Sequence, residues 1–190
     1  MAQVLYVTHS TSEDNERGLA AGHHDAPLSP LGERQARELG ERYAGEQLDA
    51  IFCSDLQRAV RTAALAFPGR GETITCDYRL RECDFGAVTQ TTSATIEATR
   101  SSYVETAHPG GESYRQVAAR VADFLRDLVA ANPDGRVLIV GHRATWFALE
   151  HLLRGVPLAE AVATPFAWQP GWWYTIDARA EQNLKRMNRA

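Results

Sequence analysis

The chain has 190 residues, of which 44% are hydrophobic and 23% charged, and its formal net charge at pH 7 is −4. This length accommodates one sizeable core, so we expect a single domain over residues 1–190. The acidic balance, with no obvious basic face, argues against nucleic acid as a partner. We expect no membrane span and no signal peptide, and therefore a cytoplasmic protein.

The alternation of apolar runs with amphipathic segments predicts alternating strands and helices. In chain order we expect a strand at 4–9, a helix at 30–43, a strand at 49–54, a helix at 55–67, a strand at 73–76, helices at 93–103 and 112–131, a strand at 137–142, a helix at 145–154 and a strand at 171–177. This order predicts an α/β fold with a mainly parallel sheet and helices on both faces.

Two connections are longer than ordinary loops, which suggests a functional role. The first covers residues 10–30 and is polar and glycine-containing. The second covers residues 85–109, where the hydrophobic pattern weakens and a threonine-rich run precedes the helix expected at 93–103. We interpret residues 85–109 either as a lid over a site or as a surface excursion without a role.

The three cysteines, Cys53, Cys76 and Cys83, are odd in number and lack the CxxC spacing of metal sites. This usage favours reduced thiols over a disulfide framework. We interpret all three as small buried residues.

Polar side chains follow the predicted strands at the carboxyl edge of the sheet, where open α/β folds bind their ligands. His9 and His142 each end an apolar run, Arg58 lies one turn into the helix after the second strand, and Glu82 follows the third. Two imidazoles, a guanidinium group and a carboxyl group suit phosphoryl transfer. A neutral imidazole can attack phosphorus, the guanidinium group can clamp phosphoryl oxygens, and the carboxyl group can act as general acid.

The chain resembles the histidine phosphatase superfamily, also called the phosphoglycerate mutase-like family, over most of its length. Six pieces in order carry the resemblance: Val7-Thr8-His9-Ser10 with Asn15, residues 25–36, residues 54–63, Leu80-Arg81-Glu82-Cys83-Asp84-Phe85-Gly86, Pro109-Gly110-Gly111-Glu112-Ser113, and Val140-Gly141-His142. The resemblance implies a three-layer α/β/α sandwich and a phosphatase that acts on a small phosphorylated molecule without a metal or other cofactor. It leaves a homodimer open.

By the same resemblance, His9 is the nucleophile that forms a phosphohistidine and Glu82 is the general acid. Arg58 and His142 are phosphate ligands, and Asn15 lies in the same pocket.

One departure from the family's pattern lies beside the nucleophile. The family's signature is Arg-His-Gly, whereas this chain has Thr8-His9-Ser10, so a fixed positive charge is missing. Loss of such a preorganised donor costs about 2.7–4 kcal/mol of transition-state stabilisation. Arg143, directly after His142, is a candidate replacement, although it could equally face solvent or pair with an acidic neighbour.

Other interpretations of these residues remain open. Glu82 could form a plain ion pair with Arg79 or Arg81, and the adjacent His23 and His24 are expected to face water rather than bind a metal. Four aromatic residues are expected to pack the last strand and its approach, and one of them could wall the substrate site: Trp168, Trp172, Trp173 and Tyr174.

The most direct functional hypothesis is a phosphomonoesterase. An alternative is a repurposed pocket in which His9 and Glu82 perform acid/base chemistry on a metabolite without phosphate. A third hypothesis is an inactive protein that binds a partner.

Overall fold

The computed structural model describes residues 1–70 and 74–186. Its sheet has five strands in the order β3-β2-β4-β1-β5. Their bounds are β1 (Gln3–Thr8), β2 (Ala50–Cys53), β3 (Ile74–Cys76), β4 (Arg136–Gly141) and β5 (Trp172–Thr175). Four strands are parallel, and β5 alone runs antiparallel to β1. The expected mainly parallel sheet is therefore confirmed.

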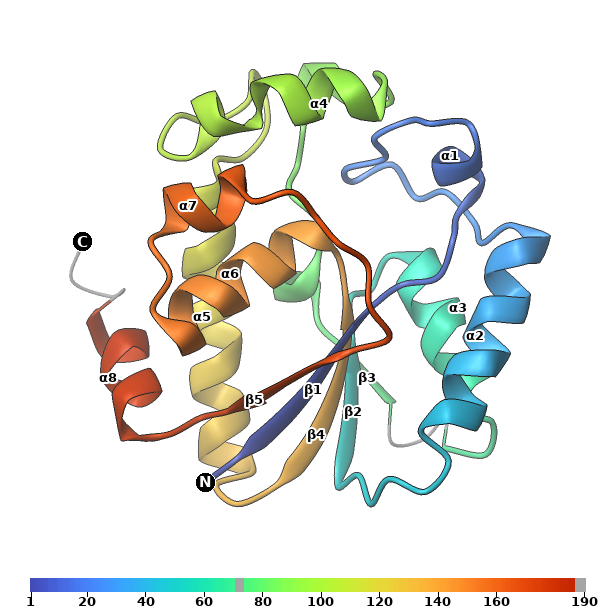
Figure 1. Ribbon diagram of the computed structural model, residues 1–190, viewed down its shortest axis with the longest axis vertical. Coiled ribbons are helices and arrows are strands. Elements are labelled where there is room, and N and C mark those ends of the chain that lie inside the picture. Colours follow the sequence, from blue (N-terminus) through green and yellow to red (C-terminus); the bar gives the residue numbers. More distant parts are fainter. Residues whose placement is uncertain (71–73, 187–190) are drawn as a thin grey trace.

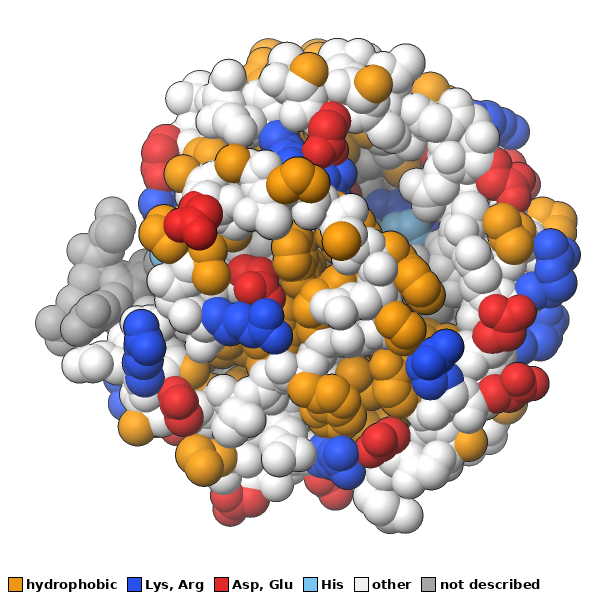
Figure 2. Space-filling view, viewed as in Figure 1, with side chains coloured by type: hydrophobic (Ala, Val, Ile, Leu, Met, Phe, Trp, Pro, Cys, Tyr) orange, Lys and Arg blue, Asp and Glu red, His pale blue; other side chains and the backbone are white. Residues whose placement is uncertain are grey.

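Helices cover both faces of the sheet, as Figure 1 shows, with α2 and α3 on one side and α5, α6 and α8 on the other. The α-helices are α1 (Glu13–Glu16), α2 (Pro30–Arg42), α3 (Gln57–Ala66), α4 (Ser93–Thr99), α5 (Tyr114–Ala131), α6 (Arg143–Arg154), α7 (Leu158–Ala163) and α8 (Ala178–Arg186), and the 3-10 helices are η2 (Tyr78–Leu80), η3 (Gly86–Val88) and η4 (Arg100–Tyr103). The three-layer α/β/α arrangement is confirmed. The surface is hollowed below α4 (Figure 2).

Every element expected from the sequence is present, with shifts of one to three residues at most ends. The helix expected over 93–103 becomes 3-10 after Thr99, and Thr73, expected to begin the third strand, lies outside the described residues. The short helix α1 was missed because a capping box between Ser12 and Asn15 stabilises it rather than an apolar stripe. The helices α7 and α8 were also missed.

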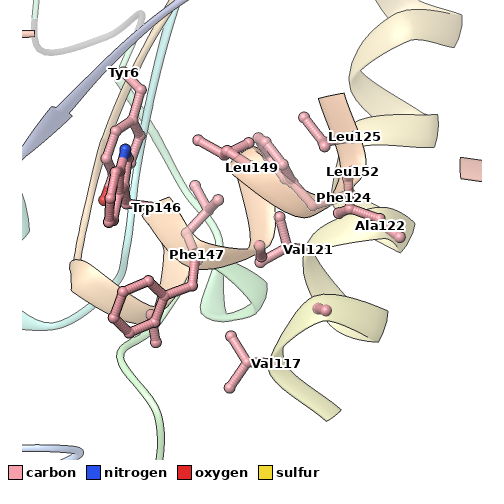
Figure 3. Close-up of a cluster of buried hydrophobic side chains, with 14 of the residues drawn as sticks. Tyr6, Val117, Val121, Ala122, Phe124, Leu125, Trp146, Phe147, Leu149 and Leu152 are labelled. Atoms are coloured by element: carbon pink, nitrogen blue, oxygen red, sulfur yellow. The ribbon is translucent and has the colours of Figure 1, made fainter. Parts of the chain in front are cut away.

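The larger core cluster lies between the sheet and the helices α5 and α6. Figure 3 shows Leu149 and Leu152 of α6 opposite Val121, Phe124 and Leu125 of α5, and all five are buried. The smaller cluster packs α3 against the other face of the sheet. Together the clusters fix the sheet from both sides, so the residues that follow the strands are held on a rigid edge.

The cysteine interpretation is wrong for one residue. Cys53 and Cys83 are buried, but Cys76 is exposed because it lies on β3, at the edge of the sheet.

The start of α2 holds the loop that follows β1. Gly32 packs so closely that a Cβ added there would lie 2.0 Å from the carbonyl oxygen of Thr11. The Thr11 amide also donates to Gln35 Oε1 at 3.0 Å. The position of this loop therefore depends on a helix residue without a side chain.

We expect Gly32→Ala to destabilise the fold by about 1–3 kcal/mol, although alanine favours helices, because the added methyl group overlaps backbone that must shift. Chemical denaturation measures the change in the free energy of unfolding. Gly45→Ala is the matched control, since nothing lies within 4 Å of an added Cβ there. Equal stability of the two variants would contradict this account of the packing.

Candidate active site

The pairing of β1 with β4 brings the two strand-end histidines together. Thr8 is aligned with Gly141, so His9 and His142 leave the sheet side by side at its carboxyl edge. Their ring centroids are 4.9 Å apart, and the ring planes are inclined at 55°.

Backbone contact fixes the tautomer of His9. Its Nδ1 lies 2.7 Å from the carbonyl oxygen of Ser10, and because a carbonyl only accepts, Nδ1 carries the proton. The lone pair is then on Nε2, which accepts a hydrogen bond from Arg58 Nε at 3.3 Å. Burial and the nearby Arg58 charge lower the pKa of His9 to about 3. The ring is therefore neutral at pH 7 and carries a nucleophilic nitrogen.

Arg58 is buried near the start of α3 and is oriented by backbone carbonyls. Its Nη1 donates to the carbonyl oxygen of His24 at 2.9 Å, and its Nη2 donates to that of Gly22 at 2.8 Å. Burial lowers the pKa of Arg58, although nearby carboxylates oppose the shift. Since its two carbonyl acceptors are neutral, its charge is available to an anion.

His142 is fully buried, and neither ring nitrogen has a hydrogen-bond partner among the described residues. Burial, followed by the charge of Arg58, lowers its pKa well below the usual value. Its backbone is held on both sides: the carbonyl oxygen accepts from the Tyr6 hydroxyl, and the amide donates to Thr145 Oγ1 at 3.4 Å. A buried imidazole without a partner is suited to receive a ligand.

Glu82 is held by backbone amides and not by an ion pair. Its Oε1 accepts from the amide of Cys83 at 2.8 Å and from that of Ala144, in the first turn of α6, at 3.1 Å. The two arginines considered as partners are engaged elsewhere, Arg81 with Asp55 and Arg79 with Asp77 and Asp127. The plain ion-pair interpretation of Glu82 is therefore wrong.

No pattern in the sequence points to Arg120, which fixes the backbone around Glu82. From α5 it donates to the carbonyl oxygens of Arg79, Arg81 and Glu82 at 2.6–2.9 Å and pairs with Glu112. Because an arginine on an amphipathic helix is common, its role is visible only once the fold places it beside the loop.

The expectation that His23 and His24 face water is confirmed for His24, which is exposed, but not for His23, which is partly buried. His23 Nε2 lies 2.8 Å from the carbonyl oxygen of Glu82, and His24 Nδ1 lies 2.8 Å from Asp14 Oδ2. The His23 ring therefore ties the loop after α1 to the backbone of Glu82, and the His24 ring ties the same loop to α1.

A cavity of about 500 Å³ opens at this edge of the sheet. Arginine and histidine side chains are visible in the depth of the hollow in Figure 2. Seven of the eight residues predicted for the site line the cavity, namely Thr8, His9, Ser10, Asn15, Arg58, Glu82 and Arg143, and the eighth, His142, lies against His9. The segment 85–109 contributes Phe85, Ser93, Ile96, Glu97 and Arg100 to the lining.

The remaining predicted residues have structural contacts of their own. Asn15 Oδ1 accepts from the Ser12 amide at 3.0 Å, and the Ser10 amide donates to Thr62 Oγ1 at 3.0 Å. The Arg143 guanidinium group forms two hydrogen bonds with Glu97, at 2.6 and 3.0 Å.

Of the four aromatic residues at the last strand, only Trp168 lines the cavity. Trp172 and Tyr174 are buried in the core, and Trp173 packs under Arg136.

The lowered pKa of His9 predicts a loss of stability in acid. Between pH 6.5 and about 3 the unfolded chain binds a proton that folded His9 does not, so the free energy of unfolding falls as the pH falls. The expected contribution of His9 is about 1.4 kcal/mol per pH unit, and His142 acts in the same direction. Denaturant unfolding measures this effect. Between pH 6.5 and 5, the free energy of unfolding of His9→Gln should fall by about 2 kcal/mol less than that of the wild-type protein. Equal slopes in the two proteins would contradict the shift.

Comparison with known proteins places this chain in a family. Residues 4–189 match the model of the histidine phosphatase superfamily, branch 1. A Hydrogenobacter thermophilus protein named "Putative phosphoserine phosphatase 2" is 33% identical over 83% of this chain and 81% of its own length. A Salmonella typhi protein named "Probable phosphoglycerate mutase GpmB" is 32% identical over 83% and 77%.

Solved structures of similar proteins support the same family assignment. A mycobacterial glucosyl-3-phosphoglycerate phosphatase complexed with VO3 has a TM-score of 0.76 and 31% identity, covering 86% of this chain and 87% of its own. The Bacillus stearothermophilus protein YhfR shares the fold, with a TM-score of 0.84 and 24% identity over 94% of this chain and 93% of its own.

No helix in residues 1–70 and 74–186 is long and apolar enough to cross a membrane. The chain belongs to the histidine phosphatase superfamily.

Proposed function

We propose that this protein is a cofactor-independent phosphomonoesterase that hydrolyses a small organic phosphate through a phosphohistidine on His9. The observation that carries the proposal is the state of His9 in the cavity. Its Nε2 bears the lone pair, and the buried Arg58 Nε lies 3.3 Å from that atom. A nucleophile and a cation for the phosphoryl oxygens therefore meet at one point.

In the first step, Nε2 of His9 forms a bond to phosphorus while the bond from phosphorus to the substrate oxygen breaks. Protonated Glu82 gives its proton to the leaving oxygen, which departs as an alcohol. In the second step, Glu82 takes a proton from water, whose oxygen attacks phosphorus and releases His9 and inorganic phosphate. Arg58 and His142 bind the phosphoryl oxygens in both steps.

The phosphate charge must be met without an arginine at position 8. Arg143 would have to leave Glu97 before it could replace that arginine. We therefore assign the phosphate to Arg58 and His142. A phosphate dianion within hydrogen-bond distance favours the protonated form of an imidazole, so His142 would gain a proton when substrate binds.

The protein as a whole is proposed to act as a single domain in the cytoplasm.

The segment 85–109 is proposed as a lid, because α4 and η4 line the cavity and the segment pairs with the loop after α1. Leu19 forms an isolated β-bridge with Thr92, and the amides of Ala20 and Gln90 are bound across the same junction.

The central test is capture of the intermediate. During turnover of an aryl phosphate, rapid quenching and intact-mass analysis should show one acid-labile phosphoryl adduct that His9→Ala abolishes together with hydrolysis. His151→Ala is the matched control, because this histidine lies on α6 bound to the Val156 carbonyl and does not line the cavity.

Failure over a broad panel of phosphomonoesters would overturn the proposal. The thermal response to oxyanions then identifies the alternative. Stabilisation by vanadate without turnover indicates an inactive binding protein, and no response to phosphate, vanadate or tungstate indicates acid/base chemistry on a metabolite without phosphate.

The positive charge that is missing at position 8 can be restored by substitution. Since Thr8 lines the cavity beside His9, we expect Thr8→Arg to tighten vanadate binding by roughly tenfold or more, a smaller factor than the 10²–10³ in rate attributed to one preorganised donor. Thr8→Gln is the control, because it adds a long polar side chain without charge. Calorimetric titration measures both affinities, and equal gains in the two variants would show that charge is not the limiting feature.

A further inference from the structure

A cluster of three charged residues lies in the part of the cavity wall formed by α4, η4 and α6. Glu97 Oε2 accepts from Arg143 Nη1 at 2.6 Å, and Glu97 Oε1 accepts from Arg143 Nη2 at 3.0 Å. Arg100, which is almost fully buried, also pairs with Oε1. One carboxylate therefore contacts both guanidinium groups of this wall.

The other terminal nitrogen of Arg100 is bound to the backbone. Its Nη2 donates to the carbonyl oxygens of Ala163 and Thr164, at 3.1 and 3.0 Å. Burial disfavours the charged form of Glu97, but the two arginines outweigh it and lower the pKa of that carboxyl. Glu97 therefore remains an anion, cancels one of the two positive charges and occupies the terminal nitrogens of Arg143 that a second anionic group on a substrate would need.

The surroundings of this cluster are apolar. The Arg143 guanidinium carbon lies 5.6 Å from the ring centre of Phe147 and 5.5 Å from that of Phe166. Both rings line the cavity, and Trp168 and Ile96 also contribute to its wall. Because the cavity of about 500 Å³ is much larger than a phosphate group, the organic part of a substrate would contact these side chains.

We propose that Glu97 determines specificity by occupying Arg143 and Arg100, so that the preferred substrates are phosphomonoesters of uncharged aromatic or apolar alcohols. The inference rests on the phosphomonoesterase proposed above and names its substrate class. It separates this chain from the two relatives named for phosphoserine and phosphoglycerate, since both of those molecules carry a carboxylate.

The wild-type protein provides the first test. Steady-state kinetics should give a kcat/KM for 2-phenylethyl phosphate, which like the other two esters has an alkyl alcohol as leaving group, about tenfold or more above the values for O-phosphoserine and 3-phosphoglycerate, because a carboxylate would be placed near Glu97 while both terminal nitrogens of Arg143 are occupied. This comparison needs no variant, so it is independent of any effect of substitution on folding. Equal values, or a preference for the carboxylates, would overturn the inference.

The second test releases the arginines. Glu97→Gln keeps the shape of the side chain but removes its charge, so the preference for 2-phenylethyl phosphate should fall by about fivefold or more, mainly through a lower KM for the carboxylates. Adding Arg143→Met to Glu97→Gln should cancel that gain. An unchanged preference in Glu97→Gln would overturn the role of Glu97.

The matched control is Glu105→Gln. Glu105 lies in the same segment and pairs with Arg115 at 2.6 Å, but it is exposed and does not line the cavity. This variant makes the same change in net charge and should retain the wild-type preference. If none of the three phosphomonoesters is hydrolysed and no His9 adduct forms, the proposed function fails together with this inference. If all are hydrolysed equally through the adduct, only the inference fails.

Discussion

The register between β1 and β4 is the constraint on which the site depends. Because Thr8 is aligned with Gly141, the next residue on each strand is a histidine, and both leave the sheet at the same height. A shift of one residue would turn each apolar side chain of β1 to the opposite face, where the two core clusters could not accommodate it. The packing that stabilises the sheet therefore also sets the distance between the two imidazoles.

Burial of charge follows from this arrangement. Arg58 enters the sheet edge beside His9, where isolated ions are costly, and it is tolerated because carbonyl oxygens of the 22–24 loop accept its hydrogen bonds. His24 is in turn held by the buried Asp14. The same cation lowers the pKa of both histidines, so the site keeps neutral imidazoles and a localised positive charge in one small volume.

The sequence predicts the parts of the site that depend on local pattern. Apolar runs located the strands, and strand ends located His9 and His142, because the carboxyl edge of a parallel sheet is fixed by topology. Contacts between residues that are distant in sequence could not be predicted from local pattern. Arg120 reaches the backbone of residues 79–82 from α5, and Glu97 meets Arg143 across 46 positions. Neither contact leaves a periodic signal, so the sequence leaves open whether Arg143 replaces the missing arginine or instead faces solvent or pairs with an acidic neighbour.

The partners of each arginine divide the cavity into two electrostatic regions. Arg58 is bound only by neutral oxygens and a neutral imidazole, so its charge remains uncompensated by contact and attracts a dianion. Arg143 and Arg100 share the carboxylate of Glu97, so the wall between Phe147 and Phe166 keeps only one net positive charge, and both terminal nitrogens of Arg143 are occupied. With threonine at position 8, no second cation competes with Arg58 beside His9. A phosphate is thus directed to one end of the cavity, and the organic group is left to the aromatic end.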